Sequence, residues 1–244
     1  MENDSHRFDG KEYFIRRIIK DYFPEGKIKI LDVGCGRAHS WRNVLNDFPN
    51  ISYQGVEPDP KSAEAARKNL EGLSNARISD GLFYESSEND FDLCISLSVL
   101  EHVKQLPKFL KASVDAVKKG GLVVHRYDLG HSLFPSSLKE KFQVWLGNNF
   151  PSVLPEHKFV RYLSDSEVSE ILAGCNATTI RRTWHQMPDH KKLLSIMDTS
   201  TPAAKSLAQE LCEWEFKMSE ILPILPQKSR EKLFPSVTVW AKKV

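Results

Sequence analysis

Short β-rich runs alternate with segments of helical period along the chain, and this alternation constrains the fold more than any other feature of the sequence. The runs at residues 27–33, 51–57, 76–80, 91–96 and 122–127 predict five strands. Segments of helical period precede the first run and separate most of the others. Strands joined by helices usually pair in parallel, with helices on both faces of the sheet. The sequence therefore predicts an α/β fold with a mostly parallel sheet covered on both faces.

The second half of the chain predicts two more strands, at residues 178–184 and 236–244. Ser164 begins a capping box that leads into a helix. A longer helix is predicted from Thr201-Pro202, and its apolar stripe is expected to pack in the core rather than to bind a ligand. That stripe consists of Leu207, Leu211, Trp214, Met218 and Ile221.

Residues 129–163 interrupt this pattern, because proline, serine and aromatic residues surround a single short helix predicted near 138–146. We expect this segment to form an insertion or lid. A chain of 244 residues fits one domain. Its predicted parts are a helical cap in residues 1–26, a core in 27–128, the insertion, and the rest of the sheet with a helical insertion in 164–244.

Composition disfavours several classes of partner. The 34 Lys and Arg residues balance 32 Asp and Glu residues, and a net charge of +2 is too small for the electrostatic attraction that holds most proteins to nucleic acid. No leader-like segment is found at the start, and no apolar run approaches the roughly 20 residues that span a bilayer. The four cysteines are far apart and form no metal or redox pair. We expect a cytoplasmic protein with no membrane or nucleic-acid partner, whose oligomeric state the sequence leaves open.

A glycine-containing turn follows the first strand, and acidic residues end the next two. In the stretch ILDVGCGRAH, Gly34 and Gly36 allow the backbone to approach a ligand at the carboxyl edge of the sheet. Glu57 ends the second strand, where a carboxylate accepts hydrogen bonds from both hydroxyls of a ribose. Asp80 ends the third strand, where a carboxylate can accept from the exocyclic amine of an adenine. Glycine turns also occur as plain connectors, so the acids carry the prediction of a nucleoside site.

Two residues separate S-adenosylmethionine from a nicotinamide dinucleotide as that nucleoside. The dinucleotide motif requires a small residue at its third glycine position, where this chain has His39. The carboxylate of Asp32 would repel a pyrophosphate but suits the ammonium group of a methionine moiety. Both residues favour S-adenosylmethionine.

The segments ILDVGCG, YQGVEPD, ISDGLF, FDLCISLSVLEHV and KKGGLVVHRYDL resemble the successive motifs of class I S-adenosylmethionine-dependent methyltransferases over residues 27–129. The resemblance implies a Rossmann-like, seven-stranded sheet whose last strand is antiparallel. It implies that Asp32 lies behind the amino-acid end of the cofactor, Glu57 on the ribose, and Asp80 with Gly81 at the adenine. The full implied cofactor site is Asp32, Gly34, Cys35, Gly36, Glu57, Pro58, Asp80, Gly81, Ser96, Leu97 and His102.

A second resemblance concerns the acceptor. The segments HRYDLGHSLF and HKFVRYLSDSEVSEIL are similar to a subset of these enzymes associated with bacterial surface-polysaccharide biosynthesis. Base-modifying amino-methyltransferases carry an Asn/Asp-Pro-Pro-aromatic motif after the fourth strand, where this chain has Ser96-Leu97-Ser98-Val99. Methylation of a base amine is therefore disfavoured, and a small-molecule or carbohydrate acceptor is predicted.

A histidine is the expected general base, because its ordinary pKa lies near neutral pH. Among His102, His125, His131 and His157 we favour His131, which follows the fifth strand, with Asp128 orienting it. His131 is equally consistent with a solvent-exposed loop residue, and His125 with a buried core histidine. Catalytic roles are predicted for His131, Asp128 and His125. The same three residues do not have the spacing of a convergent metal site, so no metal is predicted.

These observations predict methyl transfer from S-adenosylmethionine to an oxygen, or less readily a nitrogen, of a small-molecule or carbohydrate acceptor. Two alternatives remain open from the sequence. One is a nicotinamide-dependent oxidoreductase on the same sheet. The other is a pseudoenzyme that binds the nucleoside, or nothing, and serves as a partner-binding scaffold.

Overall fold

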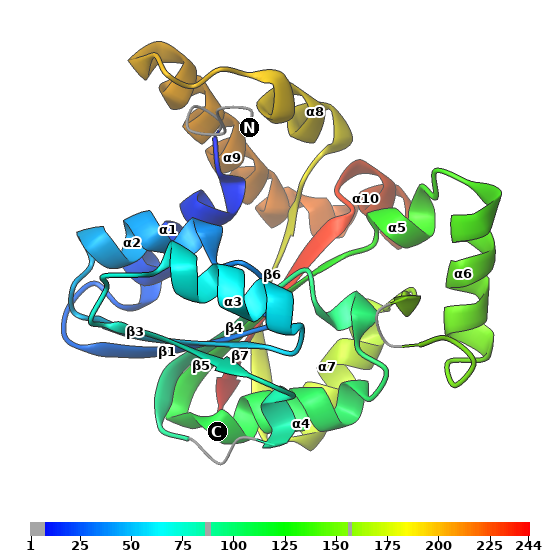
Figure 1. Cartoon of the computed structure of the whole chain (residues 1–244). Helices are drawn as coiled ribbons and strands as arrows, with labels where there is room; N and C mark the ends of the chain where they lie inside the picture. The colour runs from blue at the N-terminus through cyan, green and yellow to red at the C-terminus, as the bar shows by residue number, and fades with distance from the viewer. Residues whose placement is uncertain (1–7, 86–88, 156–157) are drawn as a thin grey trace.

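Seven strands form one sheet in the order β3-β2-β1-β4-β5-β7-β6 (Figure 1). The computed structural model describes residues 8–85, 89–155 and 158–244. Strands β1 to β5 are parallel, and β7 runs antiparallel to both of its neighbours, β5 and β6. The predicted mostly parallel sheet with an antiparallel last strand is confirmed. The strands are β1 (Ile28–Val33), β2 (Ile51–Glu57), β3 (Ala76–Asp80), β4 (Phe91–Leu97), β5 (Val117–Asp128), β6 (Ala177–His185) and β7 (Ser236–Lys243).

Helices cover both faces of the sheet, as Figure 1 shows. One face carries α1 (Gly10–Tyr22), α2 (Arg42–Asp47) and α3 (Pro60–Asn69), and the other carries α4 (Leu106–Ala116) and α7 (Asp165–Gly174). The buried apolar side chains form two clusters that correspond to these two faces. The sheet therefore separates two hydrophobic cores and leaves its carboxyl edge free for a site.

Polar side chains cap the first turns of several helices. Asp59 accepts from the backbone N–H of Ser62 at 2.9 Å and Pro60 is the first residue of α3. Ser164 caps α7 through the backbone N–H of Glu167 at 3.2 Å. Thr201 caps α9 (Pro202–Ile221) in the same way. Each cap satisfies a backbone donor that the helix itself leaves unpaired.

The prediction that the apolar stripe of α9 packs in the core is only partly right, because Met218 packs against the core whereas other members of the stripe are exposed. Leu207, Trp214 and Ile221 are between 41% and 52% exposed. The buried face of the helix instead carries Ala208, Glu215, Phe216 and Ser219. The physical reason is that α9 packs against β6 through polar contacts as well as apolar ones, which a hydrophobic periodicity cannot detect.

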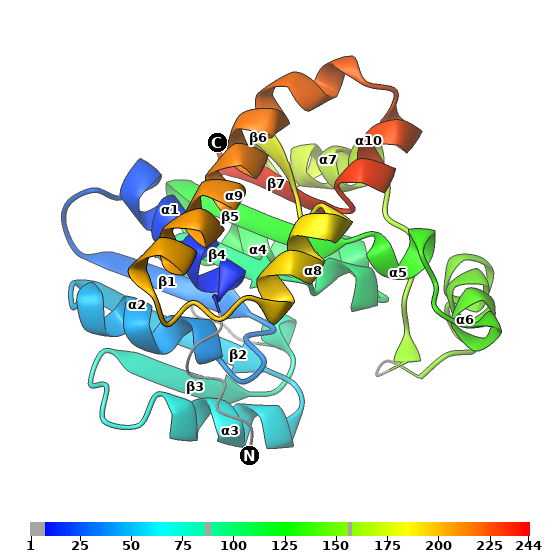
Figure 2. The same cartoon turned by 90° about the horizontal axis from the view of Figure 1, so that it is seen from above.

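Two helices that the sequence analysis did not predict flank α9: α8 (Pro188–Ile196) precedes it and α10 (Gln227–Leu233) follows. Seen from above in Figure 2, α8 and α9 lie on the same side of the sheet as α1. The connections described by the structure include the 3₁₀ turns η2 (His39–Trp41), η3 (Phe83–Glu85), η4 (Leu100–His102) and η6 (Leu222–Ile224).

The predicted insertion contains the short α5 (Gly130–Leu133) and the longer α6 (Leu138–Asn149). Both views show α6 standing apart from the sheet (Figures 1 and 2). Its side chains Phe142 and Trp145 are at least half exposed. In the part of the chain that the structure describes, no helix has the length and apolarity needed to cross a membrane.

Candidate functional site

The turn after β1 brings the backbone close to the carboxyl edge of the sheet. Gly34 and Gly36 adopt φ of +72° and +57°, a region that side-chain-bearing residues rarely occupy. The backbone N–H groups of Gly34 and Cys35 both donate to the carbonyl of Val56, at 2.8 and 3.2 Å. A Cβ on Gly34 would lie 2.7 Å from Val99 Cγ2. Only glycine at position 34 therefore keeps this turn open.

Glu57, at the end of β2, fixes the same turn from the opposite side. Its Oε2 accepts from the backbone N–H of Gly36 at 2.8 Å, and its Oε1 accepts from that of Asp59 at 3.0 Å. The side chain is 9% exposed. Each carboxylate oxygen has two acceptor positions, so each retains one for a ligand. Glu57 can thus position the turn and accept hydrogen bonds from a diol at once.

A cavity of about 530 Å³ lies at this edge of the sheet. Among the predicted cofactor residues, Gly34, Glu57, Pro58, Gly81 and His102 line it. Its remaining walls include four apolar side chains: Val99, Val103, Phe83 and Phe109. A cavity of this size with apolar walls and a few polar groups is typical of a cofactor site.

Asp32 supports the turn from below instead of lining the cavity. Its Oδ2 accepts from Trp41 Nε1 at 2.7 Å and from the Tyr53 hydroxyl at 3.0 Å, and the residue is 3% exposed. Burial raises the pKa of Asp32 to about 6, although the two hydrogen bonds act in the opposite direction. The structure thus gives Asp32 contacts with protein side chains, and its predicted position behind the amino-acid end remains a prediction.

The other predicted cofactor residues also lie around the cavity without lining it. Asp80 ends β3 with a half-exposed side chain that forms an ion pair with Arg67. Cys35 is partly buried, and burial raises the pKa of its thiol. Leu97 ends β4 as a buried residue of the apolar core. Their roles toward a cofactor remain predictions.

His125 has the contacts of a core histidine. It is fully buried on β5, and its Nδ1 lies 2.8 Å from the hydroxyl of Ser96, another predicted cofactor residue, which is itself fully buried. Burial lowers the pKa of His125 to about 3, so the ring is neutral. Neither side chain lines the cavity. These contacts correspond to the alternative that the sequence analysis left open for His125.

His102 lines the cavity, and His131 lies beside it with the two ring centroids 6.0 Å apart. Nδ1 of His102 is 2.9 Å from the carbonyl oxygen of Phe159, which can only accept, so Nδ1 carries the proton. Burial lowers the pKa of His102, which keeps the ring neutral near pH 7 and leaves Nε2 as a proton acceptor. His131 is exposed on α5. His157, also considered from the sequence, lies outside the described residues.

Asp128 holds the turn that carries His131. Its Oδ1 accepts from the backbone N–H of Gly130 at 2.7 Å, and its Oδ2 lies 3.5 Å from Lys191 Nζ. Among the described residues, no hydrogen bond joins Asp128 to the ring of His131. Asp128 therefore positions His131 through the backbone of α5.

Glu101 is a buried acid that the sequence analysis did not select. Its Oε1 accepts from the backbone N–H of Asp128 at 3.2 Å, and its buried Oε2 has no hydrogen-bond partner in the described chain. Burial raises the pKa of Glu101 to about 7. The signal available in the sequence was its place between two apolar residues and His102 after β4, but spacing alone does not show that its carboxyl group turns inward.

The comparisons with known proteins agree with this geometry. The family described as "Methyltransferase domain" matches residues 4–182 of the chain. The chain belongs to this family. S-adenosylmethionine is therefore the cofactor of this methyltransferase domain. Within the described residues, no group of three or more His, Cys, Asp or Glu side chains is placed to hold a metal ion.

Similar proteins carry several methyltransferase names. A ubiquinone biosynthesis O-methyltransferase of Rickettsia prowazekii is 28% identical over 178 residues, which cover 68% of this chain and 64% of that protein. An ajmaline N-methyltransferase of Rauvolfia serpentina is 27% identical over 49% of this chain and 43% of its own length. A structure of phosphoethanolamine N-methyltransferase 2 from Haemonchus contortus with S-adenosyl-L-methionine matches with a TM-score of 0.63 at 19% identity, over 99% of this chain and 54% of that one.

These comparisons establish the family and the fold of the methyltransferase domain. The chain spans just under two thirds of the length of the Rickettsia relative. The further resemblance to the polysaccharide subset is not confirmed by them.

Proposed function

We propose that this methyltransferase domain transfers a methyl group from S-adenosylmethionine to an oxygen, or less readily a nitrogen, of a small-molecule or carbohydrate acceptor. The observation that carries the proposal is the cavity between the glycine turn and Glu57, in a chain whose family is that of methyltransferase domains. The names of two relatives, an O-methyltransferase and an N-methyltransferase, support these two classes of acceptor atom.

The cavity residues fit the cofactor. The free acceptor positions of Glu57 suit the two ribose hydroxyls, because its carboxylate is already held rigid by two backbone N–H groups. The apolar side chains of Phe83, Val99 and Phe109 suit an adenine ring. Gly81, with φ of +112° and open space where its Cβ would be, allows the backbone to approach that ring. Asp80, at the same strand end, is proposed to accept from its exocyclic amine.

In the reaction the S–CH₃ bond breaks as the bond from carbon to the acceptor oxygen forms, and the proton of the hydroxyl passes to a base. The sulfonium supplies its own electrophilic activation, so holding the nucleophile in line is the main task of the protein. We assign the base to the pair His131 and His102, since His102 lines the cavity, His131 packs against it, and Nε2 of His102 is a proton acceptor. A general base typically contributes about 10² to 10⁴ in rate.

The acceptor is proposed to enter beside residues 129–163. This segment carries His131 on α5 and contributes the carbonyl of Phe159 that orients His102. Its movement would change the positions of both imidazoles at once, which is the behaviour expected of a lid.

Calorimetric titration with S-adenosylhomocysteine, S-adenosylmethionine and NAD tests the proposal without knowledge of the acceptor. We expect micromolar binding of the two sulfur nucleosides and no binding of NAD. In the same titration Glu57→Ala should bind the sulfur nucleosides more weakly, and Glu64→Ala, on the exposed side of α3, is its matched control. Binding of NAD alone would support the oxidoreductase alternative, and binding of none of the three would support the scaffold alternative.

A further inference from the structure

A second cavity, of about 380 Å³, lies on the α1 side of the sheet. Its walls come from α1, from the carboxyl ends of β5 and β6, and from α8 and α9. The aromatic side chains of Tyr13, Phe14 and Phe216 form much of the lining. Lys191, at its rim, lies 3.5 Å from Asp128 of the segment that carries His131. Through Lys191 and Asp128, the lining of this cavity is in contact with the turn that carries His131, the proposed base.

Arg126 places a positive charge in this apolar cavity. The residue belongs to β5 and is only 5% exposed. Its Nε donates to the hydroxyl of Ser236 at 2.9 Å, and its guanidinium carbon lies 5.1 Å from the centroid of the Phe14 ring. Within the described chain, no carboxylate lies within ion-pair distance of it. A buried cation normally requires an anionic partner, because removal from water is costly.

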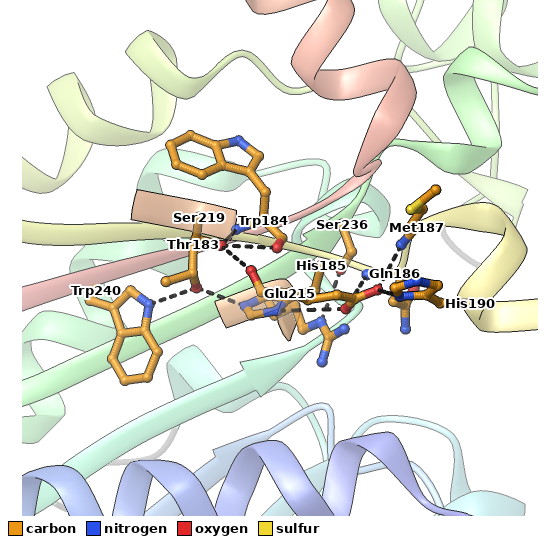
Figure 3. Close-up of polar contacts among 11 residues, drawn as sticks. Thr183, Trp184, His185, Gln186, Met187, His190, Glu215, Ser219, Ser236 and Trp240 are labelled. Atoms are coloured by element: carbon orange, nitrogen blue, oxygen red, sulfur yellow. Dashed lines mark hydrogen bonds and ion pairs between the residues drawn. The ribbon is translucent and has the colours of Figure 1, made fainter. Parts of the chain in front are cut away.

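The nearby carboxylate of Glu215 accepts hydrogen bonds from other groups. Figure 3 shows it at the connection between β6 and α8, where Oε2 accepts from the backbone N–H of Gln186 at 2.9 Å and Oε1 from that of Met187 at 3.0 Å. His190 Nδ1 lies 3.3 Å from Oε1. These contacts hold Gln186 in a backbone conformation with φ of +62°. Glu215 thus shapes the cavity wall and leaves the guanidinium of Arg126 without a charged partner.

The histidine between these two residues does not supply a charge either. His185 is 3% exposed, and its Nε2 lies 2.8 Å from the hydroxyl of Thr183, which also accepts from Trp240 Nε1 at 3.1 Å (Figure 3). Burial and the charge of Arg126 both lower the pKa of His185, so its ring is neutral. Arg126 is then the buried positive charge in a largely aromatic pocket.

We propose that this cavity binds the methyl acceptor, and that the acceptor carries a carboxylate held by Arg126 on an apolar body that contacts Phe14 and Phe216. The inference rests on the proposed methyltransferase function. The guanidinium edge left free by Ser236 matches the two oxygens of a carboxylate. Lys11 and Lys191 also line the cavity, and their charges are balanced by those of Asp9 and Glu215. Arg126 is then the unbalanced positive charge of the lining, so a single negative charge is favoured over a doubly charged phosphate.

Matched acid and amide probes test this inference. We would titrate the protein, saturated with S-adenosylhomocysteine, with 3,4-dihydroxybenzoate and with 3,4-dihydroxybenzamide, which differ in charge but hardly in shape. The acid is expected to bind at least tenfold more tightly than the amide. Arg126→Gln should abolish this preference while leaving the affinity for S-adenosylhomocysteine unchanged. Arg181→Gln, on β6 and outside the cavity lining, is the control and should keep the preference.

Each contrary outcome has a distinct meaning. Equal affinity for acid and amide, or no binding of either, overturns the inference in the wild-type protein even if Arg126→Gln does not fold. A preference that survives in Arg126→Gln also overturns it. Tighter binding of 4-nitrophenyl phosphate than of the acid overturns the assignment of a single charge. Failure of S-adenosylhomocysteine to bind overturns the proposed function itself, whereas normal binding without an acid preference overturns only the acceptor site.

Discussion

Replacement of Glu101 by glutamine should change the pH dependence of folding stability. In the folded protein, burial raises the pKa of this carboxyl group to about 7, from an ordinary value of 4.5. Between these two values the unfolded chain has lost the proton and the folded chain keeps it. The contribution of Glu101 to the free energy of unfolding of the wild type is therefore fully present below pH 4.5 and is lost as the pH rises through 7. The shift of about 2.5 corresponds to about 3 kcal/mol at 1.36 kcal/mol per pKa unit.

Glutamine has no proton to lose, and its amide oxygen can still accept from the backbone N–H of Asp128. The measurement is urea unfolding of wild type and Glu101→Gln at pH 4.5, 6 and 8. The free energy of unfolding of the variant, minus that of wild type, should rise by up to about 3 kcal/mol across this range. Taking the change with pH cancels any constant packing cost of the amide. Glu170→Gln, on the exposed side of α7, is the matched control.

A difference that stays flat from pH 4.5 to 8 would refute the reasoning, because it would mean that the carboxyl group ionises as easily in the folded protein as in the unfolded chain. A difference that falls with pH would mean that a cation holds the ionised form. Lys11 is the nearest candidate, since its charge acts to lower the pKa of Glu101.

Three further predictions concern the site. Glu57→Ala should weaken S-adenosylhomocysteine binding by about 3 kcal/mol, from two lost charge-assisted hydrogen bonds, and calorimetry that finds unchanged affinity would remove the ribose assignment. His131→Ala should lower kcat by at least about tenfold with unchanged cofactor affinity, a split measured by steady-state kinetics and titration together. Gly34→Ala should lower both cofactor affinity and Tm, because its Cβ would lie 2.7 Å from Val99 in a backbone conformation that disfavours alanine, and a normal melting curve with normal affinity would contradict this.

The sequence predicts the sheet well because its signals are local. The runs at β2 and β3 are bounded by turn residues and acids, and their predicted limits agree with the structure residue for residue. The glycine turn is local too, since Gly34 and Gly36 directly follow the end of β1. Such features require only neighbouring residues, so periodicity and turn chemistry suffice to find them.

Features that depend on contacts between distant segments were missed. The buried face of α9 carries Glu215 because the backbone N–H of Gln186, in the connection between β6 and α8, needs an acceptor. In the sequence, Arg126 is a single charged residue within a predicted strand. Its burial depends on the packing of α1 against the sheet, which the sequence does not show. Nothing near Asp32 in the sequence shows that its carboxylate accepts hydrogen bonds from Trp41 and Tyr53. Sequence spacing carries no information about these partners.

The placement of β7 between β5 and β6 has a consequence for the order in which the protein acquires its two cavities during synthesis. The residues that line the first cavity, including the glycine turn and Glu57, all precede residue 110. They are therefore synthesised in the first half of the chain. β6 has no neighbour in the sheet until β7 leaves the ribosome, and Ser236, which holds Arg126, is the first residue of that strand. We expect nucleoside recognition to arise co-translationally and acceptor recognition to be gained only with the last strand, so that an unfinished chain binds the methyl donor before it has anything to methylate.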